Sequence, residues 1–254
     1  MTRVTPLGQR LGELTTRELS ARLAAGPVIA LLPVGSTEPH GPHLPLSTDA
    51  RISEAVAHRA AERLTMEGHD ALVCPEIPYG VTDFAEGFAG AVSIPAEVLT
   101  AFLRAVGEGL LAQGFSEVCF INNHLEPAHD AAVRAAAKLV GSRASVACPL
   151  TRKWARTLTD EFKSGACHAG QYETSLVKAI DESLVRPAGQ ALPALSLSLS
   201  DGIKEGRTTF RAIGMNEAYT GAPGDASVEE GNATLERLTE MVVGEIMEAR
   251  RARA

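Results

Sequence analysis

Short, continuously apolar runs alternate along this chain with longer stretches in which apolar residues recur every three or four positions. The continuous runs are typical of strands buried on both faces, whereas the periodic stretches predict helices with one buried side. Ile52, Val56 and Ala60, for example, follow one another at i, i+4 spacing. We expect strands at 28–34, 71–75, 117–122 and 144–148, and helices at 16–24, 50–67, 96–113, 127–140, 170–181 and 226–250.

Strands that alternate with helices favour a mainly parallel sheet with helices on both faces. Residues 1–254 contain no stretch that resembles a domain linker or an internal repeat, so we expect a single α/β domain. Residues 183–224 differ from the rest of the chain in composition and pattern, because they are rich in glycine and proline and include a Ser/Leu alternation. This segment predicts an irregular loop with room for two short strands, and long loops are often functional.

The net charge of the chain excludes some classes of binding partner. With 254 residues, a net charge of −7 and a pI near 5.6, it would be repelled by nucleic acid and by anionic membranes. No apolar run reaches the ~18 residues of a membrane helix, and no signal-peptide core follows the first residues. The four cysteines form no C-x-x-C pair. We therefore expect a reduced, cytoplasmic protein that acts on a small molecule, without nucleic-acid or membrane partners.

The segment after the first predicted strand concentrates acidic and imidazole side chains. Glu38, His40 and Asp49 lie within a dozen residues of one another, in a stretch stiffened by prolines. Nitrogen and carboxylate ligands at this density suit a divalent zinc, manganese or iron ion. Asp49 also precedes a predicted helix, where a capping carboxylate is common. Because Ser or Asn would cap equally well without adding charge, metal ligation is the favoured interpretation.

A second polar cluster follows the third predicted strand. It contains His124 and Glu126, and the carboxyl ends of parallel strands face one crevice. We therefore expect these two residues near Glu38, His40 and Asp49. Five candidate ligands exceed what one tetrahedral catalytic site uses, and they suit two metal ions about 3.5–4 Å apart. The sequence does not choose between zinc, manganese and iron.

A third cluster, around residue 168, offers groups that move protons. His168 lies just before a predicted helix, and an imidazole beside activated water can act as a proton shuttle. Glu173 falls in the first turns of that helix, where it is either a further ligand or a support for a ligand histidine. Cys167 next to His168 raises the possibility of a nucleophile and its base, but adjacent side chains usually diverge, so this interpretation is disfavoured.

Several other residues have two interpretations. Asn123 is either a turn residue at the strand end or a substrate contact, and Trp154 either roofs a substrate pocket or packs a helix. His43 is interpreted as a brace for its loop rather than a ligand. His129, three residues after Glu126 on a predicted helix, is interpreted as structural.

These motifs resemble the creatininase (creatinine amidohydrolase) family. The resemblance rests on P-V-G-S-T-E-P-H-G-P-H-L-P-L-S-T-D at 33–49, N-N-H-L-E at 122–126 and H-A-G-Q-Y-E-T-S at 168–175. It implies a largely parallel α/β domain, a binuclear centre that typically holds zinc or manganese, and a homo-oligomer that is commonly a hexamer. It also implies the following roles: Glu38 and His124 bind one metal, His40 and Glu126 bind the other, Asp49 bridges them, and His168 is the catalytic histidine.

The chain departs from creatininase itself around the expected pocket. The tryptophan and glutamate that precede the catalytic histidine there are replaced by the run at 163–167, Lys-Ser-Gly-Ala-Cys. The usual F-P-G-T-x-S becomes Phe-Ala-Gly-Ala-Val-Ser at 88–93. Glu126 is retained, although relatives with N-G-H-G-G-N lack an acid at that position. We therefore expect an intact metal centre beneath a changed pocket, and a substrate other than creatinine.

The favoured function is hydrolysis of an amide bond in a small molecule by a hydroxide that bridges two divalent metal ions, with His168 protonating the leaving nitrogen. The alternative is ring opening of a polyhydroxylated, inositol-derived cyclic ketone, because the changed pocket is expected to have fewer aromatics and more small polar groups. A further alternative is a non-catalytic metal-binding or assembly protein. Apolar residues at 194–200 and 208–223, which these loops are not expected to bury alone, add to the expectation of a homohexamer.

Overall fold

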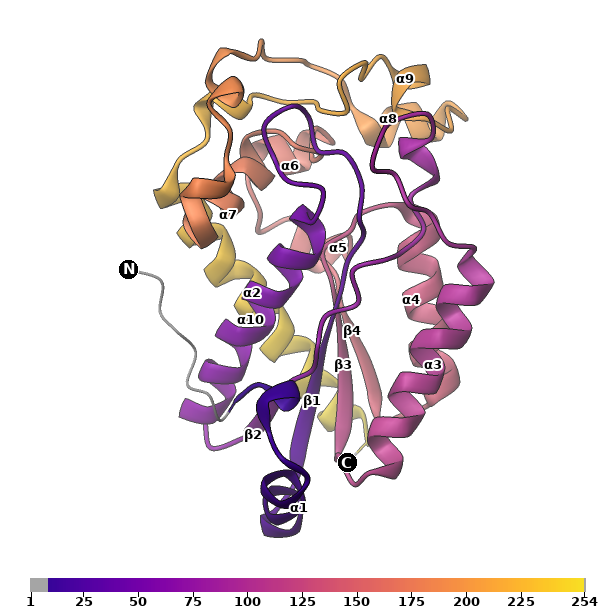
Figure 1. The fold of residues 1–254 in the computed structure, drawn as a ribbon, viewed down its shortest axis with the longest axis vertical. Coiled ribbons are helices and arrows are strands. Elements are labelled where there is room, and N and C mark those ends of the chain that lie inside the picture. Colours follow the sequence, from indigo (N-terminus) through magenta and orange to yellow (C-terminus); the bar gives the residue numbers. More distant parts are fainter. Residues whose placement is uncertain (1–8, 254) are drawn as a thin grey trace.

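A four-stranded sheet forms the centre of the computed structural model, which describes residues 9–253 (Figure 1). Its strands are β1 (Val28–Val34), β2 (Asp70–Val73), β3 (Glu117–Asn122) and β4 (Ala144–Ala147), in the order β2-β1-β3-β4. Every neighbouring pair is parallel. The prediction of a parallel sheet is confirmed, and the strand limits agree with the predicted ones to within two residues.

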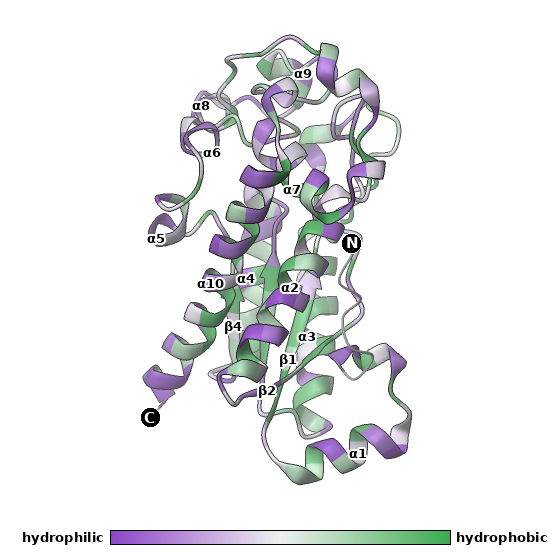
Figure 2. Ribbon diagram, turned by 90° about the vertical axis from the view of Figure 1, so that its left-hand side faces the viewer, coloured by the Kyte–Doolittle hydropathy of each residue, from purple (hydrophilic) through white to green (hydrophobic). Residues whose placement is uncertain are grey.

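Helices cover both faces of this sheet, also as predicted (Figures 1 and 2). One face carries α2 (Thr48–Met66), α7 (Gln171–Asp181) and α10 (Val228–Arg253), and the other carries α3 (Ala96–Ala112) and α4 (Pro127–Val140). The helix α1 (Thr16–Ala25) lies at the end of the sheet where β1 begins and has no buried residue (Figure 1). Ile29 and Leu31 of β1 face the first layer, and Ala30 and Leu32 face the second. Both sets are buried, which explains why this strand reads as one continuous apolar run. None of the described helices is long and apolar enough to cross a membrane.

The order of the strands creates a switch point between β1 and β3. The chain leaves β1 through α2, on one face, to reach β2 at the edge, and it returns through α3, on the opposite face, to β3. The connections after β1 and β3 therefore diverge above neighbouring strand ends. In open α/β sheets this crevice is the usual position of a ligand site.

Short helices lie beyond this end of the sheet (Figure 1). They are α5 (Arg152–Ala155), α6 (Asp160–Ser164), α8 (Leu199–Lys204) and α9 (Phe210–Ile213). The prediction of two short strands in 183–224 is wrong, since the described residues there form short helices, and their one β-type pairing is an isolated bridge between Leu195 and Gly221. Apolar residues at 194–200 and 208–223, which are not expected to be buried within one chain, are partly buried there. Leu199, Phe210 and Ile213 are buried against residues around Ala85 of the same chain, a long-range contact that local patterning does not reveal.

Candidate metal centre

The three polar clusters of the sequence meet above the carboxyl ends of β1 and β3. Glu38 and His40 come from the segment after β1, Asp49 from the first turn of α2, His124 and Glu126 from the segment after β3, and His168 and Glu173 from the start of α7 and the residues before it. All seven side chains are buried. The topology therefore brings together the residues that strand-end reasoning expected at one crevice.

Among the residues that the structure describes, the candidate ligand atoms fall into three groups, each spanning at most 4.8 Å. One contains Glu38, His124 and Glu126, the second His40, Asp49 and Glu173, and the third Glu38, His40 and His168. Glu126 thus lies with Glu38 and His124 rather than with His40, and Glu173 takes the place beside His40. This grouping differs from the pairing that the family resemblance implied, because α7 brings Glu173 to within 3.5 Å of the His40 Nε2 atom.

Asp49 belongs to the group with His40 and Glu173, and it also faces His124 of the group with Glu38 and Glu126. Its Oδ1 atom is 3.1 Å from His40 Nε2, and its Oδ2 atom is 3.0 Å from His124 Nδ1. Asp49 Oδ2 and His40 Nε2 are among the described buried atoms that make no hydrogen bond of regular geometry, so their close approaches to His124 and Asp49 are ion pairs only. Buried polar atoms are nearly always satisfied, so this pair of atoms fits a site for cations.

Backbone carbonyl groups orient the two imidazoles. His40 Nδ1 is 3.2 Å from the Glu38 carbonyl oxygen, and His124 Nε2 is 2.7 Å from the Val81 carbonyl oxygen. A ring nitrogen facing a carbonyl oxygen carries a hydrogen, which directs the opposite nitrogen toward the carboxylates. His40 therefore presents Nε2 to the centre, and His124 presents Nδ1.

The pKa values in the cluster show how strongly its charges depend on one another. Burial raises the pKa of Glu173 to about 8 and that of Glu126 to about 7. Burial also disfavours the charged form of His40, but the carboxylates of Asp49 and Glu173 outweigh it and raise its pKa to about 10. For Asp49, burial is outweighed by His40 and His124, which hold the pKa of its carboxyl well below the ordinary value. Since no lysine or arginine lies among the described residues lining the pocket, positive charge must come from protons or cations.

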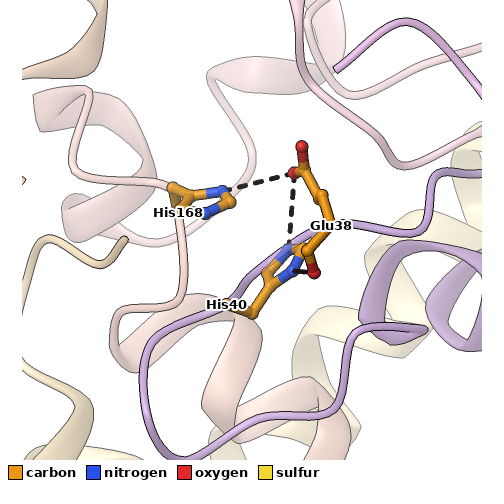
Figure 3. A group of neighbouring side chains, drawn as sticks. All are labelled: Glu38, His40 and His168. Atoms are coloured by element: carbon orange, nitrogen blue, oxygen red, sulfur yellow. Dashed lines mark hydrogen bonds and ion pairs between the residues drawn. The ribbon is translucent and has the colours of Figure 1, made fainter. Parts of the chain in front are cut away.

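His168 lies near Glu38 and His40, but it belongs neither to the group that contains Asp49 nor to the group that contains His124. Its Nε2 atom is 3.0 Å from the Pro39 carbonyl oxygen, which directs Nδ1 to within 3.7 Å of Glu38 Oε1 (Figure 3). The ring lies between the His40 ring, at 4.4 Å, and the Phe210 ring, at 4.3 Å. Burial and the charge of His40 lower the pKa of His168 to about 4, so its resting form near neutral pH is uncharged.

The structure gives a structural role to each of the three remaining candidate residues, Asn123, Trp154 and His43. Asn123 Nδ2 donates to Ser53 Oγ at 3.2 Å, and Asn123 does not line the pocket. Trp154 Nε1 donates to Glu245 of α10 at 2.5 Å, so it packs a helix instead of roofing the site. His43 Nε2 lies 2.9 Å from Thr174 Oγ1 and braces its loop, in agreement with the sequence interpretation.

Cys167 lines the pocket but does not have the properties of a nucleophile. Burial raises the pKa of its thiol to about 12, so the reactive thiolate is disfavoured. This supports the interpretation that Cys167 and His168 are not a nucleophile and its base.

Apolar side chains form one wall of the pocket above the cluster. Phe84, Leu199, Ile203 and Phe210 line it together with Leu125 and Pro127. The sequence reasoning missed the first four, because they come from segments far from the polar motifs and carry no local signal of a shared site. No serine, threonine, asparagine or glutamine is among the described residues that line the pocket, so the expectation of more small polar groups is wrong for this lining.

Comparison with known proteins agrees with this geometry. The creatininase family model, described as creatinine amidohydrolase, matches residues 12–246. The mycofactocin precursor peptide peptidase of Mycobacterium ulcerans is 33% identical over 246 residues, covering 93% of this chain and 91% of that protein. The protein of the same name from Mycolicibacterium smegmatis is 42% identical over 115 residues, covering 45% of this chain and less than half, 44%, of that protein. A solved structure named "Creatininase Mn" has a TM-score of 0.72 and 25% identity, covering 94% of this chain and 98% of that chain.

The family match and the relatives place this molecule in the class of metal-dependent hydrolases, and its buried carboxylates and imidazoles at the switch point of a parallel α/β sheet fit that class. The family match covers nearly the whole chain and is more specific. This chain belongs to the creatininase family, as its sequence motifs predicted.

Proposed function

We propose that this enzyme uses two divalent metal ions to hydrolyse an amide bond in a small molecule, and that this amide is a peptide bond. The observation that carries the proposal is the position of Asp49, whose two carboxylate oxygens face His40 and His124 at 3.1 and 3.0 Å. A carboxylate with one oxygen toward each of two ligand groups has the arrangement of a bridging ligand.

The residues divide naturally between two ions. One ion would be held by Glu38, His124 and Glu126, the other by His40 and Glu173, with Asp49 shared between them. Divalent ions at such a site polarise a carbonyl group and lower the pKa of bound water from 15.7 to roughly 7. Mixed nitrogen and carboxylate ligands are compatible with zinc, manganese or iron.

His168 supplies the proton transfer in this proposal. Because its resting form is uncharged, Nδ1 can accept a proton from the attacking water, while Nε2–H stays bound to the Pro39 carbonyl group. The same Nδ1 atom then delivers the proton to the leaving nitrogen. The hydrogen bond to Pro39 keeps the ring in one orientation through both steps.

The apolar wall favours a peptide with an apolar side chain beside the cleaved bond. Phe84, Ile203 and Phe210 offer no hydrogen bonds to the hydroxyl groups of a polyhydroxylated ketone, and burying such groups unpaired is costly. A peptide amide also agrees with the peptidase names of the two mycobacterial relatives. Ring opening of a cyclic ketone therefore becomes the less favoured alternative.

Turnover measurements on a substrate panel test this proposal. The panel pairs short blocked peptides carrying an apolar residue with matched peptides carrying Asp or Lys there, and adds creatinine, a formamide and a polyhydroxylated cyclic ketone. We expect turnover of the apolar peptides, and none by the Asp49→Asn variant. Turnover of the ketone alone would establish the alternative function, and metal-loaded protein that turns over nothing would favour a non-catalytic role.

Metal content provides a separate prediction. Protein purified without chelator should contain close to two divalent ions per chain, because six buried side chains offer two sets of ligands, and Asp49 faces a histidine of each set. Elemental analysis measures this ratio, and removal and return of the metal should abolish and restore activity. A ratio that stays near zero after metal is added would contradict the binuclear centre.

We also expect a closed homo-oligomer, most simply a hexamer, in accordance with the family resemblance. Its support in this chain is a set of exposed apolar side chains, including Val98 and Phe102 one turn apart on α3, which are 51% and 48% exposed. Light scattering should give about six times the 26.7 kDa of one chain. A monomer mass at micromolar concentration would contradict this expectation.

A further inference from the structure

Four consecutive residues, 81–84, contact candidate ligands from the side opposite the centre. They lie in the connection between β2 and α3, and we refer to them as the supporting segment. His124 Nε2 donates to the Val81 carbonyl oxygen at 2.7 Å, and the Thr82 hydroxyl group donates to Glu38 Oε2. The backbone amides of Asp83 and Phe84 donate to the two carboxylate oxygens of Glu126, at 3.0 and 3.3 Å.

These contacts are selective. The supporting segment reaches Glu38, His124 and Glu126, which together form one of the three ligand groups. The candidate ligands of the other ion, His40 and Glu173, are held by residues outside the supporting segment. His40 Nδ1 is oriented by the Glu38 carbonyl group, and Glu173 Oε2 accepts a hydrogen bond from the Ala169 amide at 2.6 Å. A displacement of the supporting segment would therefore disturb one ligand group and leave His40 and Glu173 in place.

A buried histidine on α4 anchors this segment. The Val81 amide donates to His129 Nδ1 at 3.2 Å, and the His129 ring meets the His124 ring nearly edge-on, with centroids 4.6 Å apart. Gly80 packs so closely that a Cβ atom there would overlap the His129 ring. His129 is fully buried and belongs to none of the ligand groups among the described residues.

We infer that His129 is a positioning residue of the metal centre, which holds Val81 and thereby sets the orientation of the Glu38–His124–Glu126 group. The inference rests on the proposed binuclear centre. It goes beyond the structural role that the sequence suggested, because a residue that only packs the core would not act on one ligand group alone. Partners of ligating groups typically change metal affinity by about 10–100-fold when they are removed.

The test uses two pairs of variants of the full-length protein. His129→Phe keeps an aromatic ring but removes the acceptor for the Val81 amide, and His129→Asn returns an acceptor near the position of Nδ1. Thr82→Val removes the hydroxyl group that Glu38 accepts from, and Thr82→Ser restores it. The two Thr82 variants keep the experiment decisive if His129→Phe does not fold.

Stepwise affinities for Zn²⁺ and Mn²⁺ are measured by competition with a chelator, together with the melting temperature of the metal-free protein. We expect His129→Phe and Thr82→Val to weaken one of the two binding steps by roughly 10–100-fold, to spare the other step, and to be largely rescued by Asn and Ser.

Two unchanged binding steps in folded His129→Phe, or equal weakening of both steps, would overturn the inference even where the wild-type protein binds two ions. A wild-type protein that binds no metal would overturn the binuclear centre and this inference together.

Discussion

Replacing Asp49 with asparagine should remove measurable turnover and lower the metal content from two ions to one or fewer. The amide keeps the shape of the side chain, but it loses the charge and one of the two oxygens that face His40 and His124. Metal activation contributes several kcal/mol to such reactions, so the loss should be roughly 10³-fold or more in kcat. Elemental analysis and steady-state kinetics on the same preparation measure both effects.

A matched control distinguishes a role of Asp49 as a ligand shared by two metal ions from a role in stabilising the N-terminus of α2. Asp160 also lies in the first turn of a helix, α6, but its side chain is 99% exposed, and Asp160→Asn should preserve metal content and rate. If Asp49 served only the N-terminus of α2, its substitution would cost about 0.3–1 kcal/mol of stability and leave the metals bound. Full activity with both ions retained would disprove the bridging assignment.

Substitution of His168 by alanine should also lower turnover, but without the loss of metal expected for the Asp49 variant. We expect normal metal content and a kcat lower by roughly 10²–10⁴-fold, because the proton-transfer group would be lost while the groups around Asp49 stay intact. Metal content, melting temperature and kcat are measured on this one variant. His58→Ala serves as a control, since His58 is a buried histidine on the part of α2 remote from the centre.

The three readouts distinguish three roles for His168. A fall in metal occupancy together with the rate would make His168 a ligand, which its place in the Glu38–His40–His168 group permits geometrically. A fall in melting temperature with kcat preserved per folded molecule would make it a core residue packed between His40 and Phe210. Either result would refute the proton-transfer role.

The elements of the fold were predictable because their signals are local. The buried run at 28–34 and the periodic stretch at 50–67 differ clearly in pattern, and both match β1 and α2 closely. The failure at 183–224 has the same origin. The short helices there are stabilised by contacts with the segment around Ala85, about a hundred residues away in the sequence, which no local window contains.

By itself, the sequence determined the parallel sheet, the family and the polar residues at the strand ends, because hydrophobic periodicity and residue chemistry are properties of short segments. The tertiary structure alone decided how those residues are grouped. Glu126 faces the amides of 83–84 and Glu173 approaches His40 because α7 and the supporting segment pack over the strand ends from opposite sides. The ring nitrogens that His40 and His124 present to the centre depend likewise on backbone carbonyl groups, and the apolar wall depends on two distant segments meeting. Such arrangements arise from side-chain directions and long-range packing, which sequence spacing does not encode.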